Sequence, residues 1–398
     1  MHTLPKNFYN PLPTAHQTLL LKACLLDNGQ AVQYWEKWML VKGFRDLTSQ
    51  PSNGILPQVY DRLDFASQRL LALLYKKMSA AGVNHPLVTA LKGYYRYIWV
   101  RNQLLKDELK NIAETFNAQG IKHIVIKGFP MTEVYYKDLG VRSVLDLDIM
   151  IHHDSWHQAL KILSENRWVS KEAQYTPEAV THSLHHATHL VKDQFEIDLH
   201  IRFHDFPLTE NTVESFWKEA ITYKPGHKML RPEHQFISAL IHGYDLGGDT
   251  ILRAIVDTTY IIQNTPGFDW KLVLEVIQQN NLHIPAKVLL EYLNNEGICP
   301  IPEYALAALQ NYSLTNKEAR YFNLLTTPDV GNGYKLLKLR LLQLGLVKVS
   351  IFEKVKILIN TYKYQWGASS LFTLAYRTTL VMIDKFKSPE KSVVTRKF

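Results

Sequence analysis

Three aspartates in two alternating segments have the residue type and spacing of a metal site. Asp146 and Asp148 lie two residues apart in VRSVLDLDIMI (141–151), and Asp198 lies in QFEIDLHIRF (194–203). Residues two apart on a β-strand project from one face, so these carboxylates would lie close together. Unpaired neighbouring carboxylates repel each other and favour a divalent cation between them. Three of them on adjacent strands would suit one or two Mg²⁺ ions bound to nucleotide phosphates.

Positive charge and exposed backbone lie near these aspartates in the sequence. IKHIVIKG (121–128) is typical of a buried strand that enters a tight turn at Lys127 and Gly128. Phosphates can approach a strand end closely at such a turn. Arg142, just before the acidic pair, could bind a phosphate with two hydrogen bonds. Taken alone, the Asp-x-Asp pair also fits the solvated polar face of an edge strand.

Histidines suggest a second interpretation. On a helix, the i, i+4 pairs His182/His186 and His185/His189 could bind a transition metal. Two His-Asp dipeptides, at 153–154 and 204–205, suggest a metal phosphohydrolase as an alternative function. Ordinary hydrogen bonding at the surface or in a cleft is the interpretation that we favour for most of these side chains. His242 and Asp257 are expected as helix-packing positions that face the cleft.

The elements that must position these residues follow from hydrophobic periodicity. Three- and four-residue spacings predict helices over residues 19–119, including 63–78 and 94–116, and again over 231–310. Between 120 and 205, strands at 121–128, 141–151 and 194–203 are interleaved with helices at 129–140 and 155–168. We therefore expect an α+β protein with a small mixed sheet. We divide it into an N-terminal helical region (1–115), an α/β core (116–225), a helical domain closing the cleft (226–330) and a C-terminal tail (331–398).

Composition excludes several classes of protein. The chain has 398 residues, of which 46% are hydrophobic and 21% charged, as in ordinary globular proteins. Two cysteines exclude a disulfide scaffold and a cysteine-based zinc cluster. No segment has the layout of a signal peptide or the length of an apolar membrane span, which predicts a cytoplasmic protein.

The net charge of +8 belongs to the tail. Residues 331–398 contain 13 basic and 3 acidic residues, whereas the rest of the chain has 32 basic and 34 acidic residues. One interpretation is a pair of amphipathic helices packed on the body with a solvated basic face. Another is peripheral contact with the inner face of a membrane, where each lysine or arginine near anionic lipid contributes about 1 kcal/mol. No nucleic-acid motif is present, so no nucleic acid is expected as a partner.

The order of motifs resembles the uncharacterised nucleotidyltransferase-like family of the DNA polymerase β nucleotidyltransferase superfamily. The resemblance rests on IKGFPMTEVYYKDLGVRSVLDLDIMI (126–151), HHATHL (185–190) and FEIDLHIR (195–202). It continues through RPEHQFISALIH (231–242) and LRAIVD (252–257), and covers roughly residues 90–310. The resemblance implies a polymerase-β-like nucleotidyltransferase core flanked by helical regions.

The resemblance also implies roles for individual residues. Asp146 and Asp148 match the metal-binding pair, and Asp198 matches the third acid, which helps to bind metal and to activate the attacking hydroxyl. Gly128 matches the turn glycine near the phosphates, with Lys127 and Arg142 as phosphate contacts. The sequence departs from the wider superfamily at Phe129, where Ser or Gly usually follows the turn glycine. His186 and His200 match positions beside the acids and could orient an acid or contact the acceptor.

The implied reaction transfers a nucleoside monophosphate from a nucleoside triphosphate, with ATP favoured, to an acceptor hydroxyl, and releases pyrophosphate. Mg²⁺ is the implied cofactor. The acceptor could be a sugar, a peptide or a protein, because similar proteins often accompany polysaccharide or peptide natural-product biosynthesis. The alternative is a catalytically inactive member that binds a nucleotide or partner through the same cleft.

Overall fold

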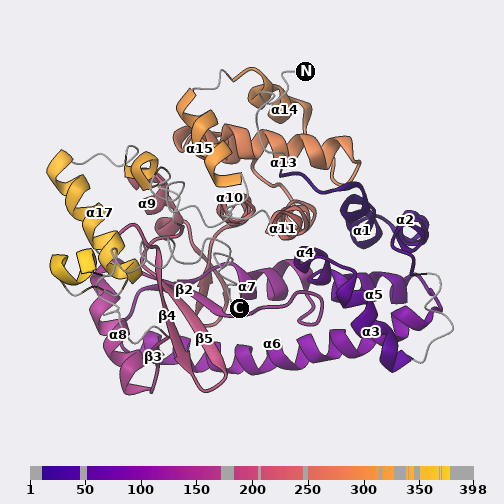
Figure 1. The fold of residues 1–398 in the computed structure, drawn as a ribbon, viewed down its shortest axis with the longest axis horizontal. Coiled ribbons are helices and arrows are strands. Elements are labelled where there is room, and N and C mark those ends of the chain that lie inside the picture. The colour runs from indigo at the N-terminus through magenta and orange to yellow at the C-terminus, as the bar shows by residue number, and fades with distance from the viewer. Residues whose placement is uncertain are drawn as a thin grey trace.

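The computed structural model describes residues 11–44, 52–171, 183–204, 208–244, 250–312, 316–326, 338, 340–344, 350–366, 368 and 370–376. Helices surround a seven-stranded mixed sheet in this part of the chain (Figure 1). The expected α+β class with a mixed sheet is therefore confirmed. One of the two candidate metal-binding histidine pairs, His182/His186, cannot be described because His182 lies outside the described residues.

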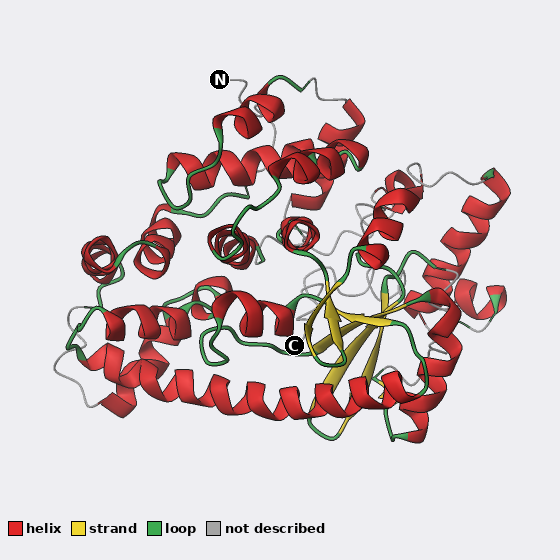
Figure 2. Cartoon of the chain, turned by 180° about the vertical axis from the view of Figure 1, so that it is seen from behind, coloured by secondary structure: helices red, strands yellow, loops and turns green. Residues whose placement is uncertain are grey.

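The N-terminal region is helical, as the periodicity predicted. It comprises α1 (Ala15–Leu25), α2 (Asn28–Val41), α3 (Ser52–Asp61), α4 (Phe65–Gln68), α5 (Leu71–Ala80) and α6 (Pro86–Ala118). Helix α6 begins with Pro86 in its first turn, where a missing N–H costs nothing, and His85 caps it. With 33 residues it is about 50 Å long and runs beneath both the other N-terminal helices and the sheet (Figure 2).

The sheet has the order β3-β4-β5-β2-β1-β7-β6. Its strands are β1 (His123–Val125), β2 (Leu147–Ile151), β3 (Val169–Ser170), β4 (Ala187–Lys192), β5 (Phe195–His200), β6 (Ile221–Lys224) and β7 (His227–Met229). β2 is antiparallel to β1 but parallel to β5, and β7 is parallel to β1. β7, the last strand of the sheet along the chain, ends at Met229. This is slightly beyond residue 225, where we placed the end of the α/β core from the sequence.

One prediction about this region is wrong, and one arrangement that we considered does not form. The strand expected over 141–151 begins only at Leu147, and residues 141–146 form an irregular loop in which Leu145 is exposed rather than buried. The helix that would pair His185 with His189 does not form, because residues 187–192 are strand β4. β4 pairs with β5 across a tight turn at Asp193, whose φ is positive. The backbone hydrogen bonds of this segment are satisfied by the neighbouring strand instead of within a helix.

Short helices connect the strands. α7 (Gly128–Pro130) and the π-helix η2 (Met131–Tyr136) lie between β1 and β2, where the sequence predicted a short helix. η3 (His153–Ser155) and α8 (Trp156–Glu165) follow β2, and α9 (Glu210–Lys218) precedes β6. One hydrophobic core lies between the sheet, α6 and α8, and a second joins the N-terminal and C-terminal helices.

The C-terminal half returns to helices, as predicted for residues 231–310. They are α10 (Pro232–His242), α11 (Ile251–Gln263), α12 (Trp270–Gln279), α13 (His283–Asn295), α14 (Glu303–Gln310), α15 (Asn316–Thr326) and α17 (Ile351–Trp366). α11 packs against both α10 and α1, so the two ends of the chain share a core. None of the described helices is long and apolar enough to cross a membrane.

Helix α17 of the basic tail is attached to the sheet by its C-terminal half. Thr361 accepts a hydrogen bond from the backbone of Leu184, and Tyr364 is buried in the core of the sheet. The N-terminal end is different, because Ile351 and Phe352 are 82% and 78% exposed. The tail therefore combines a packed segment with exposed apolar residues.

Candidate functional site

Two of the predicted carboxylates face each other across parallel strands. Asp148 on β2 is the direct register partner of Asp198 on β5, and His189 on β4 is the register partner of Asp198. Residues paired in this way project from the same face of the sheet. The three side chains thus form a row across β2, β5 and β4.

His200 extends this row into a cluster. It lies two residues after Asp198 and is completely buried, and its Nε2 lies 3.0 Å from Oδ1 of Asp148. Burial lowers the pKa of His200 to about 4, so the ring is neutral and its Nε2 proton is donated to the carboxylate. Ligand atoms of Asp148, Asp198 and His200 all lie within 4.8 Å of one another. The ring of His186 packs beside His200, with centroids 5.0 Å apart.

Asp146 lies just before β2, and its carboxylate is not among the three groups whose ligand atoms converge. The charges of Asp148 and Asp198 nevertheless affect its pKa. Burial, together with the carboxylates of Asp148 and Asp198, raises the pKa of Asp146 to about 7. A carboxyl group that resists ionisation at neutral pH marks an excess of negative charge in a confined space. The three predicted acids therefore interact electrostatically, and ligand atoms of two of them, Asp148 and Asp198, lie within 4.8 Å of each other.

Lys127 supplies the nearest positive charge. Its Nζ lies 2.8 Å from Oδ1 of Asp148, and both side chains are largely buried. Burial alone would raise the pKa of Asp148, but Lys127 and His200 together hold it well below its usual range. Asp198 is likewise kept ionised by a hydrogen bond that His189 donates, against the effect of burial on its pKa. Asp148 and Asp198 are thus anions at neutral pH.

The turn after β1 is tightly constrained. Lys127 has a φ of +53°, which is uncommon for a residue with a side chain and indicates local strain at this point. A Cβ on Gly128 would lie 2.8 Å from a methyl carbon of Val144, so any larger residue would displace the loop before β2. Phe129, the departure from the superfamily pattern, is buried in the core of the sheet. Its side chain fills space in that core.

Arg142 does not extend toward open space as predicted for a phosphate contact. Its Nε and Nη2 donate hydrogen bonds of 3.0 and 2.8 Å to the two carboxylate oxygens of Asp257, and both residues are buried. Tyr136 donates a third hydrogen bond to the same carboxylate, at 2.6 Å. The remaining nitrogen, Nη1, would lie 3.7 Å from a Cβ on Gly128. Arg142 therefore connects the loop before β2, close to Gly128, to helix α11.

Two further arginines lie near the loop over residues 141–146. We did not identify either of them from the sequence. Arg253 on α11 is buried and donates a hydrogen bond of 3.1 Å to the carbonyl oxygen of Ser143. Arg69, at the end of α4, makes no ion pair with any described residue, although the charge of Asp146 reaches it. Burial and the neighbouring Arg142 lower the pKa of Arg69 to about 10. Arg253 and Asp257 are four residues apart in the sequence, a spacing that places both on one face of a helix. No pattern in the sequence linked Arg69 to the acids.

Among the described residues, His204 is not part of the group of ligand atoms that contains the first His-Asp dipeptide. His153 and Asp154 lie on η3 with His152, where their ligand atoms form a small exposed group of their own. His204 is buried and lies 3.1 Å from Oγ of Ser238 on α10, and Asp205 lies outside the described residues. The described residues therefore give no support to a joint His-Asp phosphohydrolase site. His242 and Asp257 lie on α10 and α11 as expected.

The chemistry of the acidic cluster fits a hard divalent cation. Carboxylate oxygens are the ligands that Mg²⁺ prefers, and the raised pKa of Asp146 shows that negative charge here lacks full compensation. A cation at Asp148 and Asp198 would provide that compensation, and Lys127 already contributes one positive charge at this place. The donor set thus fits Mg²⁺ better than a soft metal, since no described cysteine is near it.

Fold and site together define a mixed α/β protein whose central sheet carries a charged cluster suited to metal and phosphate. The model of a family described as uncharacterised nucleotidyltransferases matches residues 65–295, more than half of the chain. The chain therefore belongs to this nucleotidyltransferase family, as the sequence motifs indicated. The match includes every predicted acid as well as Arg69 and Arg253. Comparison with curated proteins finds no match.

Proposed function

We propose that the protein is a Mg²⁺-dependent enzyme that transfers a nucleoside monophosphate from a nucleoside triphosphate, with ATP favoured, to a hydroxyl group. The reaction would release pyrophosphate. The observation that carries this proposal is the alignment of Asp148 with Asp198 on parallel strands, beside Asp146 and Lys127. Membership of the nucleotidyltransferase family supports the general class of reaction.

In this proposal Asp146, Asp148 and Asp198 hold the metal ion. When bound, Mg²⁺ supplies positive charge that neutralises the phosphates and lowers the pKa of an attacking hydroxyl. His200 acts as a positioning residue, because its Nε2–H fixes the orientation of Asp148. His189 does the same for Asp198 through the hydrogen bond that it donates.

The triphosphate would be bound by the cationic side of the site. Lys127 lies at the turn, and Arg69 brings a guanidinium group that no described carboxylate neutralises by an ion pair. Arg142 presents Nη1 close to Gly128 while Asp257 accepts hydrogen bonds from Nε and Nη2. Fixed positive groups in a partly buried site stabilise the charge that develops on the leaving pyrophosphate.

The acceptor would lose its proton next to Asp198. Because this carboxylate is ionised at neutral pH, it can accept a hydrogen bond from a hydroxyl group and orient it for attack in line with the leaving group. The acceptor class stays as proposed from the sequence: a sugar, a peptide or a protein hydroxyl, in polysaccharide or peptide natural-product biosynthesis. His186, beside His200, is the residue that we propose for contact with it.

Calorimetric titration of ATP, GTP, CTP and UTP into the full-length protein, with and without Mg²⁺, tests this proposal. We expect Mg²⁺-dependent binding of one nucleotide, which Asp148→Asn abolishes. Asp154→Asn, which removes an exposed carboxylate on η3, is the matched control and should bind normally. The absence of binding by all four nucleotides would contradict the proposal.

A turnover assay separates the enzyme from the alternative, a catalytically inactive binding protein. Release of pyrophosphate, measured with each nucleotide and a panel of hydroxyl-bearing sugars and peptides, identifies an enzyme. A protein that binds nucleotide tightly but releases no pyrophosphate with or without acceptor, and keeps its partners when Asp148 is replaced, would be the inactive alternative.

We further propose that the tail makes peripheral contact with an anionic membrane. This proposal is supported by the N-terminal end of α17. Exposed apolar side chains lie there beside lysines: Ile351, Phe352 and Val355 with Lys354 and Lys356. Apolar side chains beside lysines are the composition that binds the headgroup region of anionic lipid.

A further inference from the structure

The loop that leads into the acids is buried although it has no regular structure. Residues 137–146 lie between η2 and β2, and all of them are described without forming helix or strand. Val141, Arg142 and Val144 in this loop are only 4%, 6% and 1% exposed. Buried backbone N–H and C=O groups need hydrogen-bond partners, and this segment is not part of the sheet. Side chains from other elements must therefore supply partners to this backbone.

Asn102 on helix α6 makes three of these contacts. Its side chain is completely buried. Nδ2 donates hydrogen bonds of 2.6 and 2.8 Å to the backbone carbonyl oxygens of Leu139 and Arg142. Oδ1 accepts a third hydrogen bond, of 3.3 Å, from the backbone N–H of Val144. The two carbonyl groups can only accept, so the amide nitrogen must face them. One side chain thus holds three backbone groups of a single loop.

Two arginines bind further carbonyl groups of the same loop. Arg101, the neighbour of Asn102 on α6, donates a hydrogen bond of 2.9 Å from Nη2 to the carbonyl oxygen of Leu145. Arg253 on α11 donates a hydrogen bond of 3.1 Å to the carbonyl oxygen of Ser143. Asn102 is the most deeply buried of the three side chains. The loop is therefore attached along its length to α6 and α11, with Asn102 at its centre.

The face of α6 that carries Asn102 contacts both the loop and the sheet. Tyr95 lies two turns before Asn102 on this face, and its hydroxyl donates a hydrogen bond of 2.8 Å to Asp138. A Cβ on Gly140 would lie 2.3 Å from Cε2 of Tyr95, so the loop backbone lies directly against this ring. Leu109, two turns after Asn102, is buried in the core of the sheet. One continuous helix thus supports the loop and the sheet together.

Asp146 is the acid that depends on this support. Asp148 and Asp198 are register partners, so the pairing of β2 with β5 fixes their backbone. β2 begins only at Leu147, which leaves Asp146 outside that pairing. The three carboxylates interact, and like charges repel, so a loop without fixed partners would relax by moving Asp146 away. The hydrogen bonds of Asn102 oppose this movement.

We propose that Asn102 is a positioning residue of the metal site. This inference rests on the proposed function, in which Asp146, Asp148 and Asp198 hold Mg²⁺. Asn102 acts through the loop backbone, which it holds so that the carboxylate of Asp146 stays close to the other two. Ligands that are already in place bind a cation more tightly, because binding then requires less ordering of the protein.

Binding of Mn²⁺ to the full-length protein without nucleotide, followed by electron paramagnetic resonance of the free ion, tests this role. Mn²⁺ binds the same kind of oxygen ligands as Mg²⁺. We expect Asn102→Ala, which removes all three hydrogen bonds, to weaken Mn²⁺ binding about tenfold, the lower end of the effect of residues that orient metal ligands. Asn102→Thr has nearly the same volume and keeps one donor, so it should weaken binding less.

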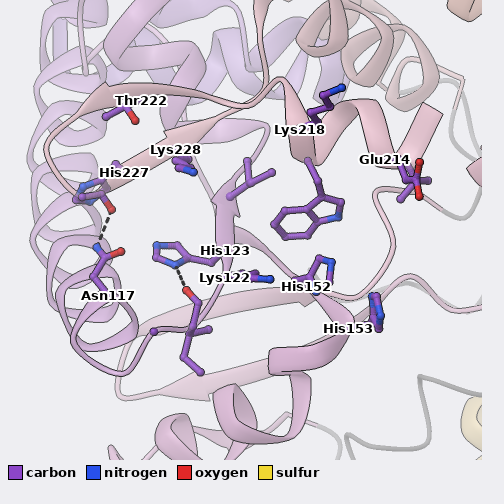
Figure 3. A pocket seen from close by; sticks show the side chains of 16 residues that line it. Asn117, Lys122, His123, His152, His153, Glu214, Lys218, Thr222, His227 and Lys228 are labelled. Atoms are coloured by element: carbon purple, nitrogen blue, oxygen red, sulfur yellow. Dashed lines mark hydrogen bonds between the residues drawn. The ribbon is translucent and has the colours of Figure 1, made fainter. Parts of the chain in front are cut away.

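Two controls on α6 separate positioning from stability. Glu108→Gln weakens a buried ion pair of 2.6 Å with Lys192, so it should lower the melting temperature but leave the affinity for Mn²⁺ unchanged. Asn117→Ala removes an asparagine that donates one hydrogen bond of 2.8 Å to the carbonyl oxygen of Gly226, in the turn between β6 and β7 (Figure 3). This turn lies at the other end of β1 from the acids, so the variant should also bind Mn²⁺ normally.

Arg101→Met tests the loop without changing a fully buried residue. Loss of its positive charge alone would strengthen the binding of a cation, whereas loss of its hydrogen bond to Leu145 releases the loop beside Asp146. We expect weaker binding of Mn²⁺ than in the wild type. Arg96→Met removes the same charge from an exposed position of α6 and should not weaken binding. If Asn102→Ala does not fold, Arg101→Met and Asn102→Thr decide.

Hydrogen exchange of a peptide that covers residues 137–147 reports on the loop directly, without metal. Exchange should be faster in Asn102→Ala than in Glu108→Gln. A wild type that binds Mn²⁺ no better than Asn102→Ala, or equal exchange of this peptide in the two variants, would overturn the role of Asn102. A wild type that binds no Mn²⁺ at all would contradict the proposed function as well, and the two failures are therefore distinguishable.

Discussion

Asp257 on α11 holds Arg142 through two hydrogen bonds, although 115 residues separate them in the chain. The pair is buried, and Tyr136 donates a further hydrogen bond to it. It fixes a helix of the C-terminal half to the loop that leads into Asp146 and Asp148. The geometry of the acids therefore depends on a contact outside the sheet.

We expect Asp257→Ala to reduce the free energy of unfolding by about 3–5 kcal/mol, because it leaves the Arg142 guanidinium buried without its partner. Urea unfolding followed by circular dichroism measures this. The double variant Arg142→Met/Asp257→Leu should recover part of the loss. Glu165→Ala, in an exposed pair on α8, should change stability by less than about 0.5 kcal/mol. A loss as small for Asp257→Ala as for Glu165→Ala would contradict the role of the pair.

Arg69→Met should weaken nucleotide binding about tenfold, and it should lower the free energy of unfolding by no more than about 1 kcal/mol, the contribution of its cation–π contact with Phe65. The guanidinium of Arg69 has no ion pair to lose within the described residues, so its charge is available to phosphate. Titration of Mg²⁺ and nucleotide into the variant tests this, with Arg96→Met on the exposed face of α6 as the control. Unchanged affinity would remove Arg69 from the proposed phosphate contacts.

Gly128→Ala should lower turnover and cost about 1–3 kcal/mol of stability. Its new Cβ would lie 2.8 Å from Val144, which is well packed, so the loop before β2 must shift. Val144→Ala removes the clashing methyl groups, and the double variant should therefore be more active than Gly128→Ala alone. If the double variant is no better than the single one, the effect of Gly128 does not arise from this contact.

Acid should destabilise the protein in part through His204. Burial holds the pKa of this ring well below its usual value of about 6.5. Below pH 6.5 the unfolded chain binds a proton at this position and the folded protein does not, so the free energy of unfolding falls with falling pH. The slope is about 1.4 kcal/mol per pH unit for one proton.

His204→Gln tests this pH effect, since glutamine can still reach Ser238 but does not titrate. Urea unfolding at several values between pH 5 and pH 7 should show a smaller slope in the variant than in the wild type. Identical slopes would mean that His204 is already protonated when folded.

The membrane proposal makes a separate prediction. Phe352→Ser should reduce co-sedimentation with vesicles that contain phosphatidylglycerol, because it removes a 78% exposed aromatic side chain from the end of α17. Phe372→Ser, at a second exposed position further along the tail, shows whether the contact is confined to α17. No sedimentation of the wild type with anionic vesicles would contradict the proposal.

Local patterns in the sequence were enough to find the strands of Asp148 and Asp198. Alternation of apolar and polar residues is a property of each strand alone, and it also indicated that their carboxylates share a face. The segment of β4 lacks this regularity, so the sequence alone did not predict a strand there. Strand β7, with three residues, is too short for any periodicity. The pairing of Arg142 with Asp257 depends on tertiary packing, which no local pattern contains.

The parallel pairing of β7 with β1 has a consequence for the order of assembly. Val125 pairs with Met229, so β1 can complete its pairing only after a strand more than one hundred residues further along the chain has been synthesised. A nascent chain that has emerged only as far as β5 can align Asp148 with Asp198, but the edge of β1 opposite β2 still lacks its strand. Loop closure over such a distance is slow relative to local contacts. We therefore expect the carboxylates to be aligned during synthesis before β1, which leads to the turn at Lys127, is paired on both sides.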